Sequence, residues 1–302
     1  MRSLLKKRVE QALSSPAVVR IVRRSVRDKR LILAYHGIIP EGAPAAGERA
    51  LFIAQRDFAA QLDVLAAMAD VAPLDRLDEE GDGRPRVAIT FDDAYRGAVN
   101  EGVRELSARG LTATIFVAPG RLNGHVFWWD SLAHESSTLA TKVRHHALHA
   151  LAGSDERVRD WALAAQLPSS DKLPAYAQTA SFVELRDALR VPGITVGSHS
   201  WSHVNLASLG AADLAEEVER PLSWLRAEFG EKAVAWLAYP YGLDSSESHR
   251  AVAKAAYSGG LRIGGGWHRP TDVSAFARPR LAIPGNLSLA GFRARLLGAM
   301  RA

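Results

Sequence analysis

Short apolar runs alternate along the chain with longer stretches whose apolar residues recur at helical spacing. Eight runs rich in β-branched and aromatic residues predict strands: Leu31–Tyr35, Asp70–Pro73, Val87–Phe91, Thr112–Ala118, Ile194–Ser198, Val234–Tyr239, Gly260–Ile263 and Leu281–Ile283. Between several of them, Asp57–Met68, Ala98–Arg109 and Ala212–Phe229 have the periodicity of amphipathic helices. Because alternating strands and helices are typical of parallel β/α units, we expect an α/β protein with its sheet closed or nearly closed into a barrel.

One long region, from Gly120 to Pro192, interrupts this alternation. It has too many residues for a single crossover, and helix-like runs occur near residues 140–151 and 155–165. We therefore predict a helical insertion at about 120–192, lying above or beside the barrel. The expected organisation is a basic N-terminal helical segment at 1–30, followed by one barrel domain at 31–302 that contains the insertion.

The composition agrees with one large domain. The chain has 302 residues, of which 47% are hydrophobic, and this suits a β/α barrel of roughly 250 residues with additions. The chain contains no cysteine. Disulfides, thiolate metal ligands and a cysteine nucleophile are therefore excluded.

Positive charge is concentrated at the N-terminus. Residues 1–30 hold ten Lys and Arg against two acidic residues, whereas the other 272 residues hold 28 against 31, although the whole chain has a net charge of +5. A slightly acidic body argues against nucleic acid as a partner. Ala17–Asp28 has the pattern of a short amphipathic helix with arginines on its polar face, which suits either an anionic membrane surface or packing on the barrel rim.

The same segment bears on location. No apolar stretch is long enough to span a bilayer, and the N-terminus lacks the uninterrupted apolar core and cleavage site of a signal peptide. We therefore expect a cytoplasmic protein with peripheral contact to the inner face of the membrane through residues 1–30. The oligomeric state stays open.

Polar residues that suit a metal site follow two of the predicted strands. Asp92 and Asp93 come directly after the third run, and His199 and His203 follow the fifth. In β/α barrels the carboxyl ends of the strands converge on one face, where the chemistry takes place. One carboxylate and two imidazoles can hold a divalent cation with a position open for water, and the second carboxylate can then take a proton from that water.

Each of these pairs alone is a weak indication. Adjacent aspartates are common in turns and at helix N-caps, and two histidines four residues apart can be unrelated. His145 and His149 have the same spacing, but they have cationic neighbours and follow no strand, so we assign them to a helix surface. The coincidence of several polar motifs at strand ends is what favours an active site.

Two further motifs follow predicted strands. His36, after the first strand, suits protonation of a leaving amine because its ordinary pKa is near neutrality; a core histidine is the alternative. Tyr239-Pro240-Tyr241-Gly242, after the sixth, is either a plain tight turn or one that aims a backbone N–H at a developing oxyanion. Both tyrosines of this turn and Trp201 are candidates for binding a sugar. Trp128 and Trp129 are further candidates, with core packing as their alternative.

Three motifs occur in an order and spacing that are found together in one known family. They are Thr90-Phe91-Asp92-Asp93-Ala94, Ser198-His199-Ser200-Trp201-Ser202-His203 and Tyr239-Pro240-Tyr241-Gly242. They resemble the Thr-Phe-Asp-Asp-Gly, His-Ser/Thr-x-x-His and Pro-Tyr motifs of the polysaccharide deacetylase family (NodB homology, carbohydrate esterase family four). The similarity extends from about Leu31 to Gly291. It implies a distorted (β/α)7-type barrel, which agrees with the predicted strands if one of the eight runs is spurious.

The resemblance implies a role for each matching residue. Asp92 would be the general base, and Asp93, His199 and His203 would hold a divalent metal, commonly zinc, with cobalt and nickel also suited to these ligands. The backbone N–H of Tyr241 would help to form an oxyanion hole. The implied reaction is hydrolysis of the N-acetyl group of a hexosamine, with release of acetate.

The chain departs from the family pattern at three places. Ala94 stands where the motif has glycine, and Ala238 stands where many members have an arginine that orients the base. Arg280, in the last strand, is a candidate substitute for that arginine. The usual C-terminal Leu-x-His acid motif is absent, since the last histidine is His268. The first strand resembles a permuted branch of the family, which implies that His36 is the acid.

The expected function is therefore metal-dependent removal of N-acetyl groups from a glycan. The substrate would be a polysaccharide or a lipid-linked saccharide, in bacterial envelope polysaccharide biosynthesis. One alternative is a related amidase that acts on a formyl group or a cyclic imide. Another is a catalytically silent carbohydrate-binding barrel.

Overall fold

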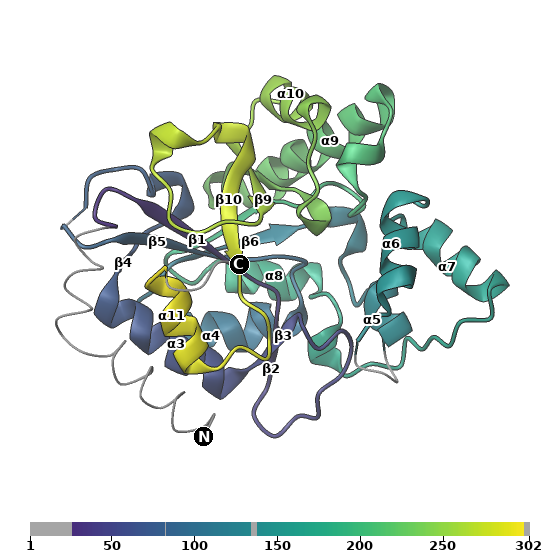
Figure 1. Ribbon diagram of the computed structural model, residues 1–302, viewed down its shortest axis with the longest axis horizontal. Helices are drawn as coiled ribbons and strands as arrows, with labels where there is room; N and C mark the ends of the chain where they lie inside the picture. The colour runs from purple at the N-terminus through teal and green to yellow at the C-terminus, as the bar shows by residue number, and fades with distance from the viewer. Residues whose placement is uncertain (1–25, 82, 134–137, 299–302) are drawn as a thin grey trace.

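A closed barrel of seven parallel strands forms the centre of the computed structural model, which describes residues 26–81, 83–133 and 138–298 (Figure 1). The strands of the main sheet are β1 (Arg30–Tyr35), β4 (Asp70–Val71), β5 (Arg86–Phe91), β6 (Ala113–Val117), β7 (Ile194–Ser198), β8 (Ala233–Ala238), β9 (Gly259–Ile263) and β10 (Arg278–Ala282). The order around the barrel is β1-β10-β9-β8-β7-β6-β5, and the pairing of β5 with β1 closes the ring. The two-residue β4 pairs only with the start of β5.

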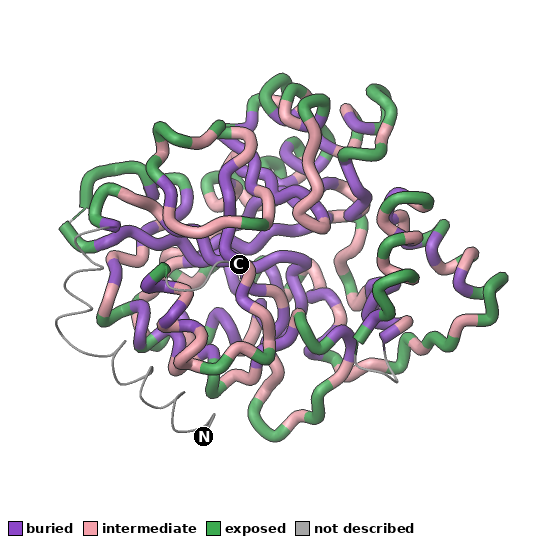
Figure 2. The backbone as a smooth tube through the Cα atoms, viewed as in Figure 1, coloured by how far each residue is buried: buried purple, intermediate pink, exposed green. Residues whose placement is uncertain are grey.

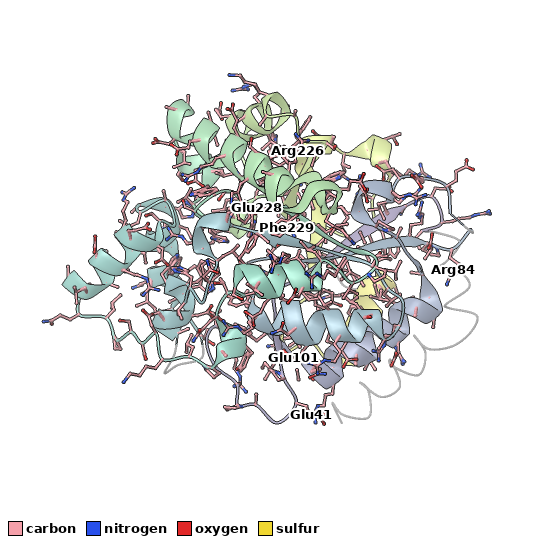
Figure 3. The ribbon with its side chains drawn as sticks, turned by 180° about the vertical axis from the view of Figure 1, so that it is seen from behind. Glu41, Arg84, Glu101, Arg226, Glu228 and Phe229 are labelled. Atoms are coloured by element: carbon pink, nitrogen blue, oxygen red, sulfur yellow. The ribbon has the colours of Figure 1, made fainter. Side chains whose placement is uncertain are left out.

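Helices cover the outside of the barrel. They are α3 (Gln55–Met68), α4 (Val103–Ser107), α8 (Phe182–Ala188), α9 (Ala211–Phe229), α10 (Ser246–Lys254) and α11 (Leu289–Leu296), and a π-helical segment at Ala98–Gly102 leads into α4. In Figure 1, α9 and α10 lie above the strands, and α3, α4, α8 and α11 lie below them. Figure 2 shows the buried strands at the centre and exposed residues along the outer helices and loops. From behind, Figure 3 shows Glu101, Arg226 and Glu228 on the outer helical surface.

The strands have long apolar runs because both of their faces are buried, as expected for a parallel sheet. Ile32, Ala88 and Phe116 belong to one buried cluster of alternating strand residues. Their neighbours, such as Leu33 and Ile89, pack in a second cluster that includes apolar residues of α3, α4 and α11. Apolar side chains therefore fill both the inside of the barrel and the layer beneath the helices.

The α/β barrel fold predicted from the sequence is confirmed. Each of the eight predicted runs overlaps a strand, so none is spurious, although the run Leu281–Ile283 meets only the end of β10. The eighth strand is β4, which lies outside the ring. Two strands were not predicted: β2 (Gly37–Ile39) and β3 (Phe52–Ala54), which form a separate parallel pair. With three residues each, they are too short for an alternating pattern to be recognised.

Among the described residues, four α-helices lie between β6 and β7; α8 covers the barrel, and the other three lie to one side of it (Figure 1). Two of them, α6 (Thr141–His149) and α7 (Asp155–Ala164), coincide with the helix-like runs noted in the sequence. The third, α5 (Trp128–Ala133), was not predicted, and its first residues carry the aromatic side chains nearest the candidate site.

The predicted amphipathic helix at Ala17–Asp28 falls almost wholly outside the described residues, and the boundary at residue 30 stays a prediction. Within the part of the chain that the structure describes, no helix combines the length and the apolar character needed to cross a membrane.

Candidate metal centre and active site

The ends of two strands bring the predicted metal ligands together. Asp93 follows β5, and His199 and His203 follow β7, with β6 lying between these strands. The Nε2 atoms of His203 and His199 lie 3.0 and 3.5 Å from Asp93 Oδ1, and the two imidazole centroids are 4.6 Å apart. All three side chains are buried, and one donor atom of each lies within 4.8 Å of the others. Among the described residues, this is the one group whose geometry suits a metal ion.

The chemistry of these donors fits a divalent cation. His199 Nδ1 lies 2.7 Å from the carbonyl oxygen of Ala238, and donation there leaves Nε2 unprotonated and facing Asp93. Burial lowers the pKa of His199 to about 4 and that of His203 to about 3, so both rings are neutral. Asp93 Oδ1 and His203 Nδ1 are buried without a hydrogen-bond partner among the described residues. Neutral imidazoles and an unpartnered carboxylate oxygen are suited to zinc.

Left-handed backbone turns aim the ligands. Asp93 and Ala94 have φ of 69° and 49°, and Ser200 and His203 have φ of 61° and 59°. Residues other than glycine adopt such angles only where the surroundings hold them, often at functional sites. The alanine that replaces the motif glycine at position 94 therefore keeps the backbone region that glycine favours. In the second turn, the N–H of His203 donates to Ser200 Oγ at 3.0 Å.

Helix α9 holds the histidine turn from outside. The backbone N–H groups of Trp201 and Ser202 each donate to the Glu217 carboxylate at 2.9 Å. The Trp201 ring also contacts α9, because the Arg220 guanidinium lies over it, 3.6 Å from the ring centroid. A sugar could stack on that face only after Arg220 moved, so sugar binding by Trp201 stays a prediction. The sequence contained no signal that would have identified Glu217.

The second carboxylate of the pair is held by an arginine from the last barrel strand. Arg280 on β10 is fully buried and donates from both terminal nitrogens to Asp92 at 2.7 Å, with a further bond to Thr90 Oγ1 at 3.1 Å. Burial alone would raise the pKa of Asp92, but Arg280 and His199 outweigh it and hold the pKa well below its usual range. Asp92 is therefore an anion, and Arg280 makes the contact with it that a substitute for the arginine missing at Ala238 would need.

His36 and Tyr241 complete the group of predicted catalytic residues. His36 Nε2 lies 3.9 Å from Asp92 Oδ2, its side chain is 20% exposed, and burial lowers its pKa. Tyr241 has φ of 61°, and its ring stands edge-on to His203 with centroids 4.7 Å apart. No described residue accepts a hydrogen bond from the Tyr241 N–H. Both residues therefore lie at the same end of the barrel as the metal ligands.

Three aromatic residues proposed for sugar contact are instead part of the protein interior. Tyr239 is fully buried, and its hydroxyl donates to the carbonyl of Phe276 at 2.7 Å. Its proposed role in substrate binding is therefore corrected to core packing. Trp128 and Trp129 are also buried, and the Trp129 ring lies 4.9 Å from that of His203.

His145 and His149 are close to each other on α6, with ring centroids 4.6 Å apart. No third histidine or carboxylate among the described residues completes a metal site with them. Their assignment to a helix surface agrees with this geometry.

Another buried carboxyl group lies close to Trp129. Asp130 on α5 is fully buried, accepts a hydrogen bond from the Glu48 N–H at 2.7 Å, and accepts another from the Tyr95 hydroxyl. Trp129 Nε1 donates to that hydroxyl at 3.0 Å. Burial raises the pKa of Asp130 to about 7. A carboxyl group with no cation beside it thus keeps its proton almost to neutral pH.

A family comparison identifies this arrangement. The family model described as polysaccharide deacetylase matches residues 79–260, more than half of the chain. The chain belongs to this family. The match includes the three predicted metal ligands, Asp92 and the Tyr-Pro-Tyr-Gly turn, whereas His36 and Arg280 lie outside it.

Solved structures share the family fold at low sequence identity. The Streptococcus pyogenes deacetylase PplD, in complex with acetate, has a TM-score of 0.61 and 16% identity over 89% of this chain and 98% of that one. IcaB from Ammonifex degensii has a TM-score of 0.62 and 17% identity over 88% and 97%. A de-N-acetylase from Aggregatibacter actinomycetemcomitans has a TM-score of 0.61 and 12% identity over 89% and 100%. Comparison with curated proteins gave no sequence match.

The protonation of Asp130 predicts a pH-dependent stability. Its pKa is about 7 in the folded chain and about 3.9 when unfolded, so the folded state binds the proton more tightly. The free energy of unfolding should therefore fall as pH rises from about 4 to 7, by up to about 1.4 kcal/mol per unit, and level off above. Asp130→Asn should remove this contribution in urea unfolding measured with chelator present. Parallel profiles for Asp130→Asn, wild type and the exposed control Asp57→Asn would contradict the assignment.

Proposed function

We propose that this chain is a metal-dependent hydrolase that removes N-acetyl groups from hexosamine units of a glycan. The observation that carries the proposal is the buried Asp92–Arg280 pair beside the Asp93, His199 and His203 group. Membership of the polysaccharide deacetylase family supports it. So do similar structures named as a deacetylase with acetate and as a de-N-acetylase.

Asp93, His199 and His203 would hold the cation, for which we propose zinc, with cobalt and nickel as other candidates for this donor set. A bound divalent cation polarises the amide carbonyl and lowers the pKa of water. The protein supplies the remaining groups. Asp92, kept anionic by Arg280, takes a proton from the attacking water.

Charge then develops on the carbonyl oxygen as the water oxygen bonds to the amide carbon. The unpartnered N–H of Tyr241 donates to this oxygen, and the preorganised turn makes the donation effective. The C–N bond breaks as protonated His36 delivers a proton to the leaving nitrogen. Acetate and the free amine of the sugar are the products, so one water is consumed for each amide cleaved.

The first experiment measures acetate release from a panel of N-acetylated glycans, with zinc added and then removed by chelator. We expect release to require zinc and to fall about 10²- to 10⁴-fold in Asp92→Asn, because the amide cannot accept the proton. Asp213→Asn, an exposed carboxylate on α9, should match wild type.

Other outcomes of that panel point elsewhere. Turnover of formylated amines or cyclic imides alone would replace the acetyl substrate with another amide. Glycan binding without any turnover, with zinc bound, would indicate a silent binding barrel. Acetate release that survives in Asp92→Asn would contradict the proposed base.

Arg280 should affect chemistry as well as stability. Arg280→Lys keeps the charge but loses the two-pronged contact, so we expect kcat to fall at least about tenfold with little change in KM. Arg280→Met leaves Asp92 buried and unpaired and should destabilise the fold by about 3–5 kcal/mol. Adding Asp92→Asn to Arg280→Met should recover much of that stability in urea unfolding.

A neighbouring arginine provides a matched control. Arg278, also buried on β10, pairs with Asp78 at 2.7 and 2.8 Å, away from the predicted catalytic residues. Arg278→Met should lower stability while leaving kcat of the remaining folded protein near wild type. An equal effect of Arg278→Met and Arg280→Lys on kcat would contradict a catalytic role of the Asp92–Arg280 pair.

We also propose a location at the inner face of the cytoplasmic membrane, in envelope polysaccharide biosynthesis. The support is the charge of residues 1–30, with ten basic side chains against two acidic ones. A basic residue near an anionic surface contributes about 1 kcal/mol.

Vesicle flotation tests this location. Replacing Arg20, Arg23 and Arg24 with glutamine should weaken binding to phosphatidylserine-containing vesicles about a hundredfold. Vesicles of phosphatidylcholine alone serve as the control. Equal binding of wild type and variant to both kinds of vesicle would contradict an electrostatic contact.

A further inference from the structure

The turn between α6 and α7 touches two parts of the active site at once. It comprises Ala150–Ser154, and its two central residues, Ala152 and Gly153, have φ of 55° and 64°. The Gly153 N–H donates to the carbonyl of Ala147 at 2.8 Å, which closes the turn onto the end of α6. The carbonyl groups of Ala152 and Gly153 each accept a hydrogen bond from a different loop of the barrel.

The first of these loops carries a metal ligand. The N–H of Asn205 donates to the Ala152 carbonyl at 2.7 Å, and Asn205 Nδ2 donates to the Leu148 carbonyl at 3.1 Å. Asn205 is 2% exposed and lies two residues after His203, whose φ is 59°. Both bonds therefore anchor the chain immediately beyond a left-handed metal ligand.

The second loop carries the predicted oxyanion donor. The Tyr241 hydroxyl donates to the Gly153 carbonyl at 2.8 Å and accepts from Trp128 Nε1 at 3.1 Å. The Tyr241 ring, which joins this hydroxyl to the backbone, stands edge-on to the His203 ring. The side chain thus connects the α6–α7 turn to the backbone of Tyr241, which has φ of 61°.

We propose that the α6–α7 turn is a positioning element that fixes His203 and Tyr241 relative to each other. The turn makes no contact with the reacting atoms; it acts through Asn205 on one side and the Tyr241 side chain on the other. The catalytic part of this inference rests on the function proposed above, whereas its effect on metal binding does not.

A substitution at Gly153 tests the proposal most directly. A Cβ at this position would lie 2.4 Å from Tyr241 Cε2 and 2.8 Å from Cζ. Real Cβ atoms do not approach this closely, so the ring would have to shift, and it packs directly on His203. Substituting Gly153 therefore displaces the contact that connects the turn to the metal centre.

Gly153→Ala can be compared with a substitution of equal backbone strain. Gly110 has φ of 62°, close to the 64° of Gly153, but nothing lies within 4 Å of its Cβ position. Zinc affinity is measured by competition with a chromophoric chelator, and kcat and KM by acetate release. We expect Gly153→Ala to weaken zinc binding and lower kcat, each about tenfold, as is typical for residues that support metal ligands. Gly110→Ala should leave both near wild type.

A second variant removes the contact without adding bulk. Tyr241→Phe keeps the ring on His203 but loses the bonds to Gly153 and Trp128, so zinc affinity and kcat should fall in the same direction. The zinc affinity of Tyr241→Phe tests the proposed role of the turn if Gly153→Ala does not fold.

The proposal would be overturned if Gly153→Ala bound zinc as tightly as Gly110→Ala does. If Gly153→Ala does not fold, the same comparison is made with Tyr241→Phe. If wild-type protein releases no acetate from any glycan, the proposed function fails, while the zinc affinities still decide the role of the turn.

Discussion

The buried pair between Asp92 and Arg280 is the interaction on which the catalytic end of this barrel depends. Two adjacent carboxylates lie at the end of β5, and both are buried, so their charge needs stabilisation by groups of the protein. One is matched by the guanidinium of Arg280 and the other faces two imidazoles. Separating the charges in this way suits the two neighbouring aspartates to the different roles proposed for them, an anionic base and a metal ligand, although their sequence contexts are nearly identical.

The sequence was sufficient for features that depend on local pattern. Strands buried on both faces have continuous apolar runs, and the polar residues that end them lie together because parallel strands end on one face. The sequence was insufficient where the role of a residue depends on packing between segments far apart in the chain. The position of Tyr239 in the sequence does not tell whether its ring binds a glycan or packs in the core. Only the fold brings the Phe276 carbonyl to its hydroxyl. Glu217 is one acidic residue among several on α9, and nothing local marks it as the anchor of the histidine turn.

The helices beside the barrel are part of the site and more than an outer covering. Phe127, directly before α5, and Trp129, in its first turn, both contact the His203 ring. Trp129 also donates to the Tyr95 hydroxyl, which is bonded to the Asp130 carboxyl group that keeps its proton. Apolar side chains beside a charged site strengthen its electrostatic interactions, because they keep water away from it. The long region between β6 and β7 therefore contributes the low-polarity side of a centre whose charged side comes from the strands.

The closure of the barrel by β10 has a consequence for how the chain acquires this centre. Leu33 of the first strand pairs with Leu281 of the last, so the ring is complete only when strands far apart in the sequence are in contact. Such pairings are slow to form because a long loop must close first. A nascent chain that ends before β10 has an unpaired edge on both β1 and β9, together with a base that has no counter-ion. β10 must therefore be synthesised before the fold loses its aggregation-prone edges.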